Sequence, residues 1–252
     1  MQKTRGVLIT MLRLFYVIFI SLPFVLYYIH KAHYITKHRE KYSEEQCYRI
    51  ARRCIRIMMI NGRIRTEAYG TELLPEEGGY VMYSNHQGKY DTLGIMISHS
   101  KPCTIVMDAT RSKMPIADPF INLVNGSRLD KTDMKKQVNT IMKIAEEVKN
   151  GRRYIVFPEG GYDHNRNDLQ EFMPGAFKCA TKYGAPIVPV AIIDSYKVFG
   201  INSLRKVKTQ VHFLKPILFE EYQHMNTQEI AQMVKERIAA VISRQLKARN
   251  AG

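Results

Sequence analysis

An apolar run near the beginning of the chain is the strongest pattern in the sequence. Residues 7–29 read VLITMLRLFYVIFISLPFVLYYI, interrupted only by Thr10, Arg13, Ser21 and Pro23. A helix of this length, at about 1.5 Å per residue, roughly matches the hydrocarbon core of a bilayer. A buried core helix is rarely this long or this apolar all round, and no small-residue cleavage site follows, as a signal peptide would need. We therefore expect membrane insertion, with Arg13 and Pro23 leaving open a shallow helical pair in one leaflet instead of a full span.

The rest of the chain alternates short apolar segments with amphipathic ones. A basic amphipathic helix is expected over 42–62, next to the apolar run. Beyond it, the patterns predict strands over 80–83, 103–107, 154–157, 187–192 and 207–214, and helices over 90–98, 133–149, 175–183 and 227–247. Asn226 and Glu229 are placed for a capping box on the last helix. Pro189, inside an apolar strand, suggests a sheet edge or a bulge.

This alternation predicts an α/β fold with a mostly parallel central sheet flanked by helices. The length of 252 residues suits one such domain with a short appendage. We divide the chain into a membrane anchor with its basic juxtamembrane helix, residues 1–62, and a second domain, residues 63–252. Functional side chains are expected in the loops that follow the strands at one edge of the sheet.

Charge is concentrated at the beginning of the chain. The formal net charge is +15, and residues 1–65 hold thirteen Lys or Arg against three acids. Such a cluster attracts polyanions, and its apolar neighbour favours an anionic membrane surface over nucleic acid, for which no helix-turn-helix or zinc signature is present. Lys31, Lys37, Arg39 and Lys41 follow the apolar run, against Lys3 and Arg5 before it. Positive charges next to a membrane segment favour its cytoplasmic side. The excess after the apolar run therefore predicts that the larger domain lies on the cytoplasmic face of the cell membrane.

The four cysteines, Cys47, Cys54, Cys103 and Cys179, form no CxxC pair and no Cys/His zinc spacing. We therefore expect no metal site and no disulfide framework.

His86 and Asp91 are the first candidate catalytic pair. The predicted strand at 80–83 runs into Ser-Asn-His-Gln-Gly-Lys-Tyr-Asp, residues 84–91. If His86 lies in the loop and Asp91 in the first helical turn, the carboxylate can accept the Nδ1 proton and leave Nε2 as a general base. The alternative is a surface histidine beside a capping aspartate, and this spacing alone often arises by chance.

A second candidate segment reads Ile-Val-Phe-Pro-Glu-Gly-Gly-Tyr-Asp over residues 155–163. It places Glu159 and two glycines, Gly160 and Gly161, after a buried strand. Paired glycines let backbone N–H groups approach a ligand closely. A tight turn with a solvated glutamate is the alternative.

Together and in this order, these segments resemble the glycerolipid acyltransferases, most of all the bacterial 1-acyl-glycerol-3-phosphate acyltransferases. The resemblance covers about residues 65–215. Asn85-His86 to Asp91 is similar to the family's N-H-x4-D block, Phe157 to Gly160 to its F-P-E-G block, and Val188-Pro189-Val190 to its V-P-V block. Arg128-Leu129-Asp130-Lys131 is similar to its apolar-Asp-Arg block.

The resemblance implies direct acyl transfer without an acyl-enzyme. His86, oriented by Asp91, would deprotonate the acceptor hydroxyl, which attacks the thioester of acyl-CoA or acyl carrier protein; these are co-substrates, and no other cofactor is implied. The resemblance assigns substrate binding to Asn85, Arg128, Lys131, Glu159, Gly160 and Gly161. The acceptor would be a lysophospholipid, 1-acyl-sn-glycerol-3-phosphate.

Two departures from the family pattern concern the acceptor's phosphate. Lys131 stands where the family usually has Arg, and Gly161-Tyr162 replace the Thr-Arg that usually follows F-P-E-G. Compensation is expected from another cation, for which Arg152, Arg153, Arg166 and Lys178 are the candidates. The departures leave open a different acceptor, glycerol-3-phosphate or another lysolipid. A non-catalytic basic membrane-binding protein is the remaining reading.

Overall fold

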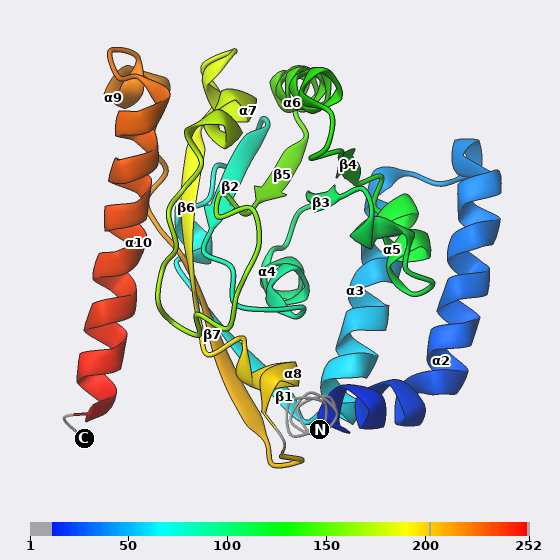
Figure 1. The fold of residues 1–252 in the computed structure, drawn as a ribbon. Coiled ribbons are helices and arrows are strands. Elements are labelled where there is room, and N and C mark those ends of the chain that lie inside the picture. The colour runs from blue at the N-terminus through cyan, green and yellow to red at the C-terminus, as the bar shows by residue number, and fades with distance from the viewer. Residues whose placement is uncertain (1–11, 202, 251–252) are drawn as a thin grey trace.

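A seven-stranded sheet forms the centre of the molecule, with helices on both of its faces (Figure 1). The computed structural model describes residues 12–201 and 203–250. The strand order is β1-β7-β6-β2-β5-β3-β4, and all neighbours are parallel except β6 and β7. The strands are β1 (Ile64–Tyr69), β2 (Tyr80–Ser84), β3 (Thr104–Asp108), β4 (Ser127–Leu129), β5 (Arg153–Val156), β6 (Ile187–Ile193) and β7 (Val207–Phe213).

The helices bury the two faces of this sheet in separate core layers. Because side chains alternate along a strand, Tyr80 and Met82 of β2 enter one layer and Val81 and Tyr83 the other. The first layer contains side chains from α2 (Leu12–Lys37), α3 (Glu44–Asn61), α4 (Asp91–Ser98) and α5 (Ala117–Leu123). The second contains side chains from α6 (Met134–Lys149), α7 (Lys178–Thr181), α9 (Phe219–Tyr222) and α10 (Thr227–Asn250). The predicted α/β class is confirmed.

Most predicted elements lie within a residue or two of their expected bounds. Ser43 caps α3 in a capping box with Gln46, and Asp133 caps α6. The backbone N–H of Asn226 donates to Glu229 while the Asn226 side chain accepts from the Glu229 N–H, as expected. The helix predicted over 175–183 is split into a 3-10 turn and the short α7. Three short helical elements of the structure, α5, α8 (Lys197–Gly200) and α9, and the strands β1 and β4 were not predicted.

Of the two alternatives predicted for Pro189, the sheet edge is wrong and the bulge agrees with the pairing. Val190 pairs with Phe213 and Ile187 bridges Ile217, so the segment opposite Pro189 holds one extra residue. Strand β6 lies between β7 and β2, inside the sheet. The proline is tolerated because the β6–β7 register begins at Val190 and Phe213. The carbonyl of Pro189 accepts the N–H of Leu214, the first residue after β7. The backbone N–H that proline lacks is therefore absent at a point where regular pairing with β7 has ended.

The apolar helix α2 is fixed to the rest of the protein through a buried arginine. Arg13 is 1% exposed, and its guanidinium donates to the carbonyls of Ser203, Arg205 and Gly62. These bonds explain how a charge is accommodated in an apolar segment. Figure 1 shows the helix changing direction along its length, and Pro23 lies inside it. Residues 1–11, including Lys3, Arg5 and the beginning of the apolar run, lie outside the described residues.

The outer side of α2 carries many exposed apolar side chains. Phe15, Phe19, Phe24, Leu26 and Tyr27 are each about half exposed or more. Within the described residues, one helix, over Arg13–Lys37, is long and apolar enough to cross a bilayer by length and composition. Helix α3 beside it contributes Cys47, Tyr48 and Ile55 to the first core layer. The division of the chain at residue 62 stays a prediction.

Candidate active site

The His86–Asp91 pair lies at the carboxyl end of β2. The strand ends at Ser84, and α4 begins at Asp91, so the intervening loop turns the imidazole back toward the first helical residue. His86 Nδ1 is 2.7 Å from Asp91 Oδ2. The second ring nitrogen, Nε2, consequently faces away from the carboxylate. This is the loop-to-helix geometry that the spacing requires for a paired histidine.

Asp91 is completely buried, and its Oδ2 atom is surrounded by donors. It accepts the backbone N–H groups of Gln87, at 2.5 Å, and Gly88, at 2.9 Å, in addition to its contact with His86. Several N–H donors stabilise an ionised carboxylate. These contacts fix Oδ2 in position against Nδ1 of the imidazole.

Two aromatic rings enclose the imidazole. The ring of Phe157 is stacked on His86 at a centroid distance of 4.2 Å and an angle of 18°. The ring of Tyr162 meets it edge-on, at 4.7 Å and 78°. The histidine side chain is 18% exposed, so one part of it still reaches solvent. The rings fix the plane of the imidazole and limit access of water to it.

Asn85, beside the histidine, is fully buried and bonds the backbone of β6. Its Nδ2 donates to the Ile192 carbonyl at 3.0 Å, and its Oδ1 accepts the Ile192 N–H at 2.8 Å. These bonds join the loop after β2 to the neighbouring strand. In this arrangement Asn85 holds the histidine loop in place, and its predicted contact with substrate is untested.

Glu159 lies close to His86 in a largely apolar position. It is 6% exposed, and burial raises its pKa to about 7, although the backbone N–H groups of His86 and Gln170 and the Gln170 amide oppose that shift. The amide of Gln170 donates to Oε2 at 3.1 Å. The other oxygen, Oε1, has no hydrogen-bond partner among the residues that the structure describes. An unpaired, buried carboxyl oxygen beside a candidate base is suited to meet a ligand hydroxyl.

The two glycines after Glu159 form an open turn. Gly160 has a φ of +71°, a backbone conformation in which a larger residue is strained. A Cβ there would also lie 2.6 Å from Met173 Cε, which the flexible methionine side chain can relieve by moving. Around Gly161 the space for a Cβ is open. Their carbonyls are engaged: that of Gly160 accepts Lys131 Nζ, and that of Gly161 accepts the Gln170 amide.

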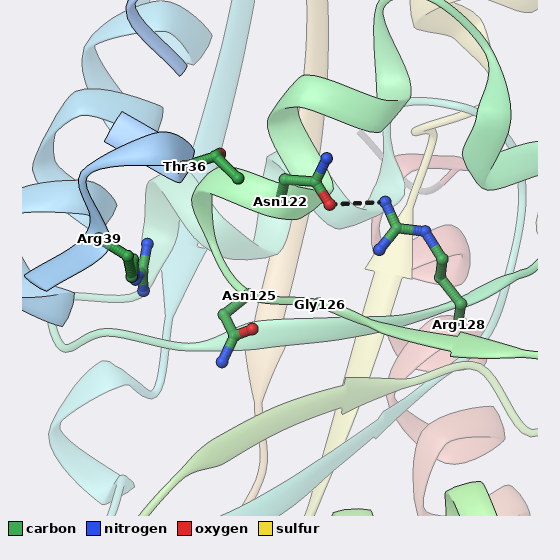
Figure 2. A pocket seen from close by; sticks show the side chains of 6 residues that line it. All are labelled: Thr36, Arg39, Asn122, Asn125, Gly126 and Arg128. Carbon is green, nitrogen blue, oxygen red and sulfur yellow. Dashed lines mark hydrogen bonds between the residues drawn. The ribbon is translucent and has the colours of Figure 1, made fainter. Parts of the chain in front are cut away.

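The predicted cations separate into two places. Lys131 bonds the Gly160 carbonyl and lies 3.8 Å from Asp108 Oδ2, next to the Glu159 turn. Arg128 instead donates to Asp118, at 2.8 Å, and to Asn122, at 2.7 Å. Figure 2 shows it lining a small pocket together with Thr36, Arg39, Asn122, Asn125 and Gly126.

Two of the four candidates for a compensating cation, Arg152 and Arg153, lie away from the histidine loop. Arg152 bonds Glu147 and Glu44, and the ring of Tyr80 lies under Arg153, both at the amino end of β5 and far from the histidine loop. Arg166 lies between Asn165, which donates to the His86 carbonyl, and Asn167, which accepts from Gln87. Lys178 begins α7.

The sequence reasoning missed another cation near the Glu159 turn. Arg111 follows β3, and its guanidinium carbon is 5.9 Å from the centroid of Tyr162. Its position directly after the carboxyl end of a strand beside β5 was the available signal.

The thiols are unsuited to act as nucleophiles. All four cysteines are free. Burial raises the pKa of Cys54 to about 11 and those of Cys103 and Cys179 to about 12, and it also raises the pKa of Cys47. A thiol with such a pKa is protonated at neutral pH and reacts poorly. Among the described residues, no group of three or more His, Cys, Asp or Glu side chains is arranged to hold a metal ion.

Solved structures and curated relatives resemble this chain over most of its length. A crystal structure of the 1-acyl-sn-glycerophosphate acyltransferase from Thermotoga maritima matches with a TM-score of 0.76, covers 98% of both chains and is 21% identical in sequence. This likeness shows the same fold. The 1-acyl-sn-glycerol-3-phosphate acyltransferase of Borreliella burgdorferi is 26% identical over 193 residues, which make up 73% of this chain and 76% of that protein.

The Escherichia coli protein of the same name is 27% identical over 155 residues, 61% of this chain and 63% of that protein. The sequence model of the acyltransferase family matches residues 65–193, just over half of the chain, and this segment contains the histidine loop and the Glu159 turn. The chain therefore belongs to the acyltransferase family.

Proposed function

We propose that the protein transfers a fatty acyl chain from a thioester donor to the free hydroxyl of 1-acyl-sn-glycerol-3-phosphate, giving phosphatidic acid. The observation that carries this proposal is the 2.7 Å contact between His86 Nδ1 and Asp91 Oδ2. The pair lies beside the Glu159 turn, to which Lys131 is bonded. The names of the Borreliella and Escherichia coli relatives support the choice of acceptor.

His86 acts as the general base. Asp91 holds the Nδ1 proton, so the lone pair lies on Nε2 and takes the proton of the acceptor hydroxyl. The hydroxyl oxygen attacks the thioester carbonyl and forms a new C–O bond. The C–S bond then breaks, and the imidazolium returns its proton to the departing thiolate. The acyl chain never bonds to the protein, which agrees with the protonated state of the four thiols.

Lys131 and Arg111 hold the acceptor's phosphate on either side of the Glu159 turn. Lys131 reaches the Gly160 carbonyl, and Arg111 lies over Tyr162, the residue that replaces the family's usual arginine. From the turn after β3, Arg111 therefore supplies a charge that is missing after the F-P-E-G block. In this proposal Glu159, whose Oε1 is buried without a partner among the described residues, exchanges a hydrogen bond with a hydroxyl of the acceptor's glycerol.

The membrane supplies the acceptor. The exposed aromatic side of α2 and the basic first quarter of the chain support binding to an anionic membrane surface. In this proposal the catalytic part lies on the cytoplasmic face. On that side acyl-CoA or acyl carrier protein is available as donor. Both donors carry the same thioester, so the proposed base serves either.

A transfer assay with purified full-length protein tests the proposal. Acceptors are 1-acyl-sn-glycerol-3-phosphate, glycerol-3-phosphate and lysolipids with larger headgroups, each offered with acyl-CoA and with acyl carrier protein. The expected result is phosphatidic acid from the first acceptor, and none from a folded His86→Ala protein. Faster turnover of another acceptor would reassign the substrate, and no transfer to any acceptor would refute the proposal.

A further inference from the structure

Ser195 lies directly behind the proposed dyad, although it is more than one hundred residues away in sequence. It is the second residue after β6 and is 2% exposed. Its Oγ donates a hydrogen bond of 2.5 Å to Asp91 Oδ1. The preceding residue, Asp194, has a φ of +62°, so the chain turns sharply at the end of the strand to bring the hydroxyl under the carboxylate.

The two oxygens of Asp91 have different surroundings. Oδ2 receives His86 and the backbone N–H groups of Gln87 and Gly88. Among the described residues, Oδ1 receives a hydrogen bond from Ser195 alone. A carboxylate can rotate about its Cβ–Cγ bond, and a donor on each oxygen fixes that rotation. The hydrogen bond from Ser195 therefore helps to set the orientation of the carboxylate relative to the imidazole.

Ser195 is itself held by the residue next to the histidine. Its backbone N–H donates to Gln87 Oε1 at 2.9 Å. The Gln87 amide donates in turn to the Ile192 carbonyl, at 2.8 Å, and to Asn167 Oδ1, at 2.9 Å. The Asn167 side chain bonds both the backbone N–H and the carboxylate of Asp194. This closed set of hydrogen bonds joins the histidine loop to the end of β6, and each of them is buried or partly buried.

We propose that Ser195 is a positioning residue of the reaction, which acts on His86 through Asp91. The inference rests on the proposed general-base role of His86. It also gives a purpose to the Val188-Pro189-Val190 strand, which has no reactive group of its own. This strand, β6, pairs with β2, and its carboxyl end positions the serine next to Asp91.

The first test compares Ser195→Ala with wild type in the full-length protein. A hydrogen bond to a charged group has a net effect of about tenfold to a hundredfold. We expect kcat to fall by about that factor while the KM values for acceptor and donor stay within about twofold, because neither substrate touches the serine. Ser195→Thr, which keeps the hydroxyl, should recover most of kcat. Ser195→Cys, similar in size but a weak donor, should behave like Ser195→Ala and serves if the alanine variant fails to fold.

Two further variants separate positioning from general destabilisation. Ser127→Ala removes a hydroxyl that bonds Tyr154 at 3.1 Å, away from the dyad, and should leave kcat unchanged. In an Asp91→Ala background, Ser195→Ala should cause no further loss, because the carboxylate through which it acts is gone. A loss that adds fully to that of Asp91→Ala, or a folded Ser195→Ala protein with kcat within about threefold of wild type, would overturn the inference.

These outcomes are distinct from a failure of the proposed function. If wild type transfers acyl chains and His86→Ala does not, the base assignment holds whatever Ser195 does. If His86→Ala keeps its activity, the proposed mechanism fails first, and the inference about Ser195 fails with it.

Discussion

Replacing Lys131 with alanine should weaken the binding of the acceptor's phosphate and leave the donor unaffected. Lys131 Nζ bonds the Gly160 carbonyl and lies 3.8 Å from Asp108, and its side chain is 42% exposed. A charge-assisted contact is worth about 1.5–3 kcal/mol. Solvent and the competing Asp108 carboxylate place this contact at the lower end, near 1.5 kcal/mol, which is about tenfold in binding.

The assay is a pair of steady-state titrations, with each substrate varied while the other is saturating. Lys131→Ala and Arg111→Ala should each raise the acceptor KM about tenfold, with the donor KM within about twofold. Lys136→Ala is the control for net charge, since that lysine pairs with Asp130 and Asp133. Arg128→Ala should lower thermal stability by breaking its bonds to Asp118 and Asn122, with little effect on the acceptor KM.

An unchanged acceptor KM in both Lys131→Ala and Arg111→Ala would refute this placement of the phosphate. A higher acceptor KM in Arg128→Ala alone would indicate that the phosphate binds in the pocket of Figure 2.

Three further predictions concern the base, the buried acid and the anchor. His86→Ala should lower kcat by at least about a hundredfold with melting temperature preserved, because it removes the general base; residual turnover near wild type in the transfer assay would exclude that role. Glu159 binds its proton more tightly in the folded protein, with its pKa raised from 4.5 to about 7, so stability should fall as pH rises between these values, by roughly 3 kcal/mol in all. Thermal unfolding at pH 5 and pH 8 measures this loss, which should largely disappear in Glu159→Gln; an equal loss in both proteins would contradict it. Deleting residues 1–40 should release the protein from membranes in a fractionation assay, and pelleting that survives high-salt washing would show that the anchor lies elsewhere.

The sequence was most informative where function and local structure coincide. The pairing of His86 with Asp91 follows from a strand, a short loop and a helix start, all within a few residues of each other. The Glu159 turn is similarly local, and the positive φ of Gly160 explains the glycine at that position. Strong apolar strands such as β2 and β6 were found because both of their faces are buried.

Contacts made by topology were not predictable in the same way. Ser195 and Arg111 reach the dyad region because β6 and β3 lie beside β2 and β5 in the sheet, and one sequence does not encode that order in any local pattern. Strand β1, Ile-Arg-Thr-Glu-Ala-Tyr, was missed because it lies at the sheet edge and holds one buried apolar side chain, Ile64. Arg128 and Lys131 stand three residues apart, yet they reach different partners because the chain leaves β4 between them.

The buried Arg13 has a consequence for how the chain assembles during synthesis. The apolar helix is made first, but two of the three carbonyls that receive its guanidinium belong to Ser203 and Arg205, 190 and 192 residues later. At about 5–20 residues per second, a ribosome needs on the order of ten to forty seconds to supply them. During that interval the cation must be solvated by water or lipid headgroups, since burying it unpaired is too costly. The docking of Arg13 is therefore complete only after the segment that leads into β7 has been made.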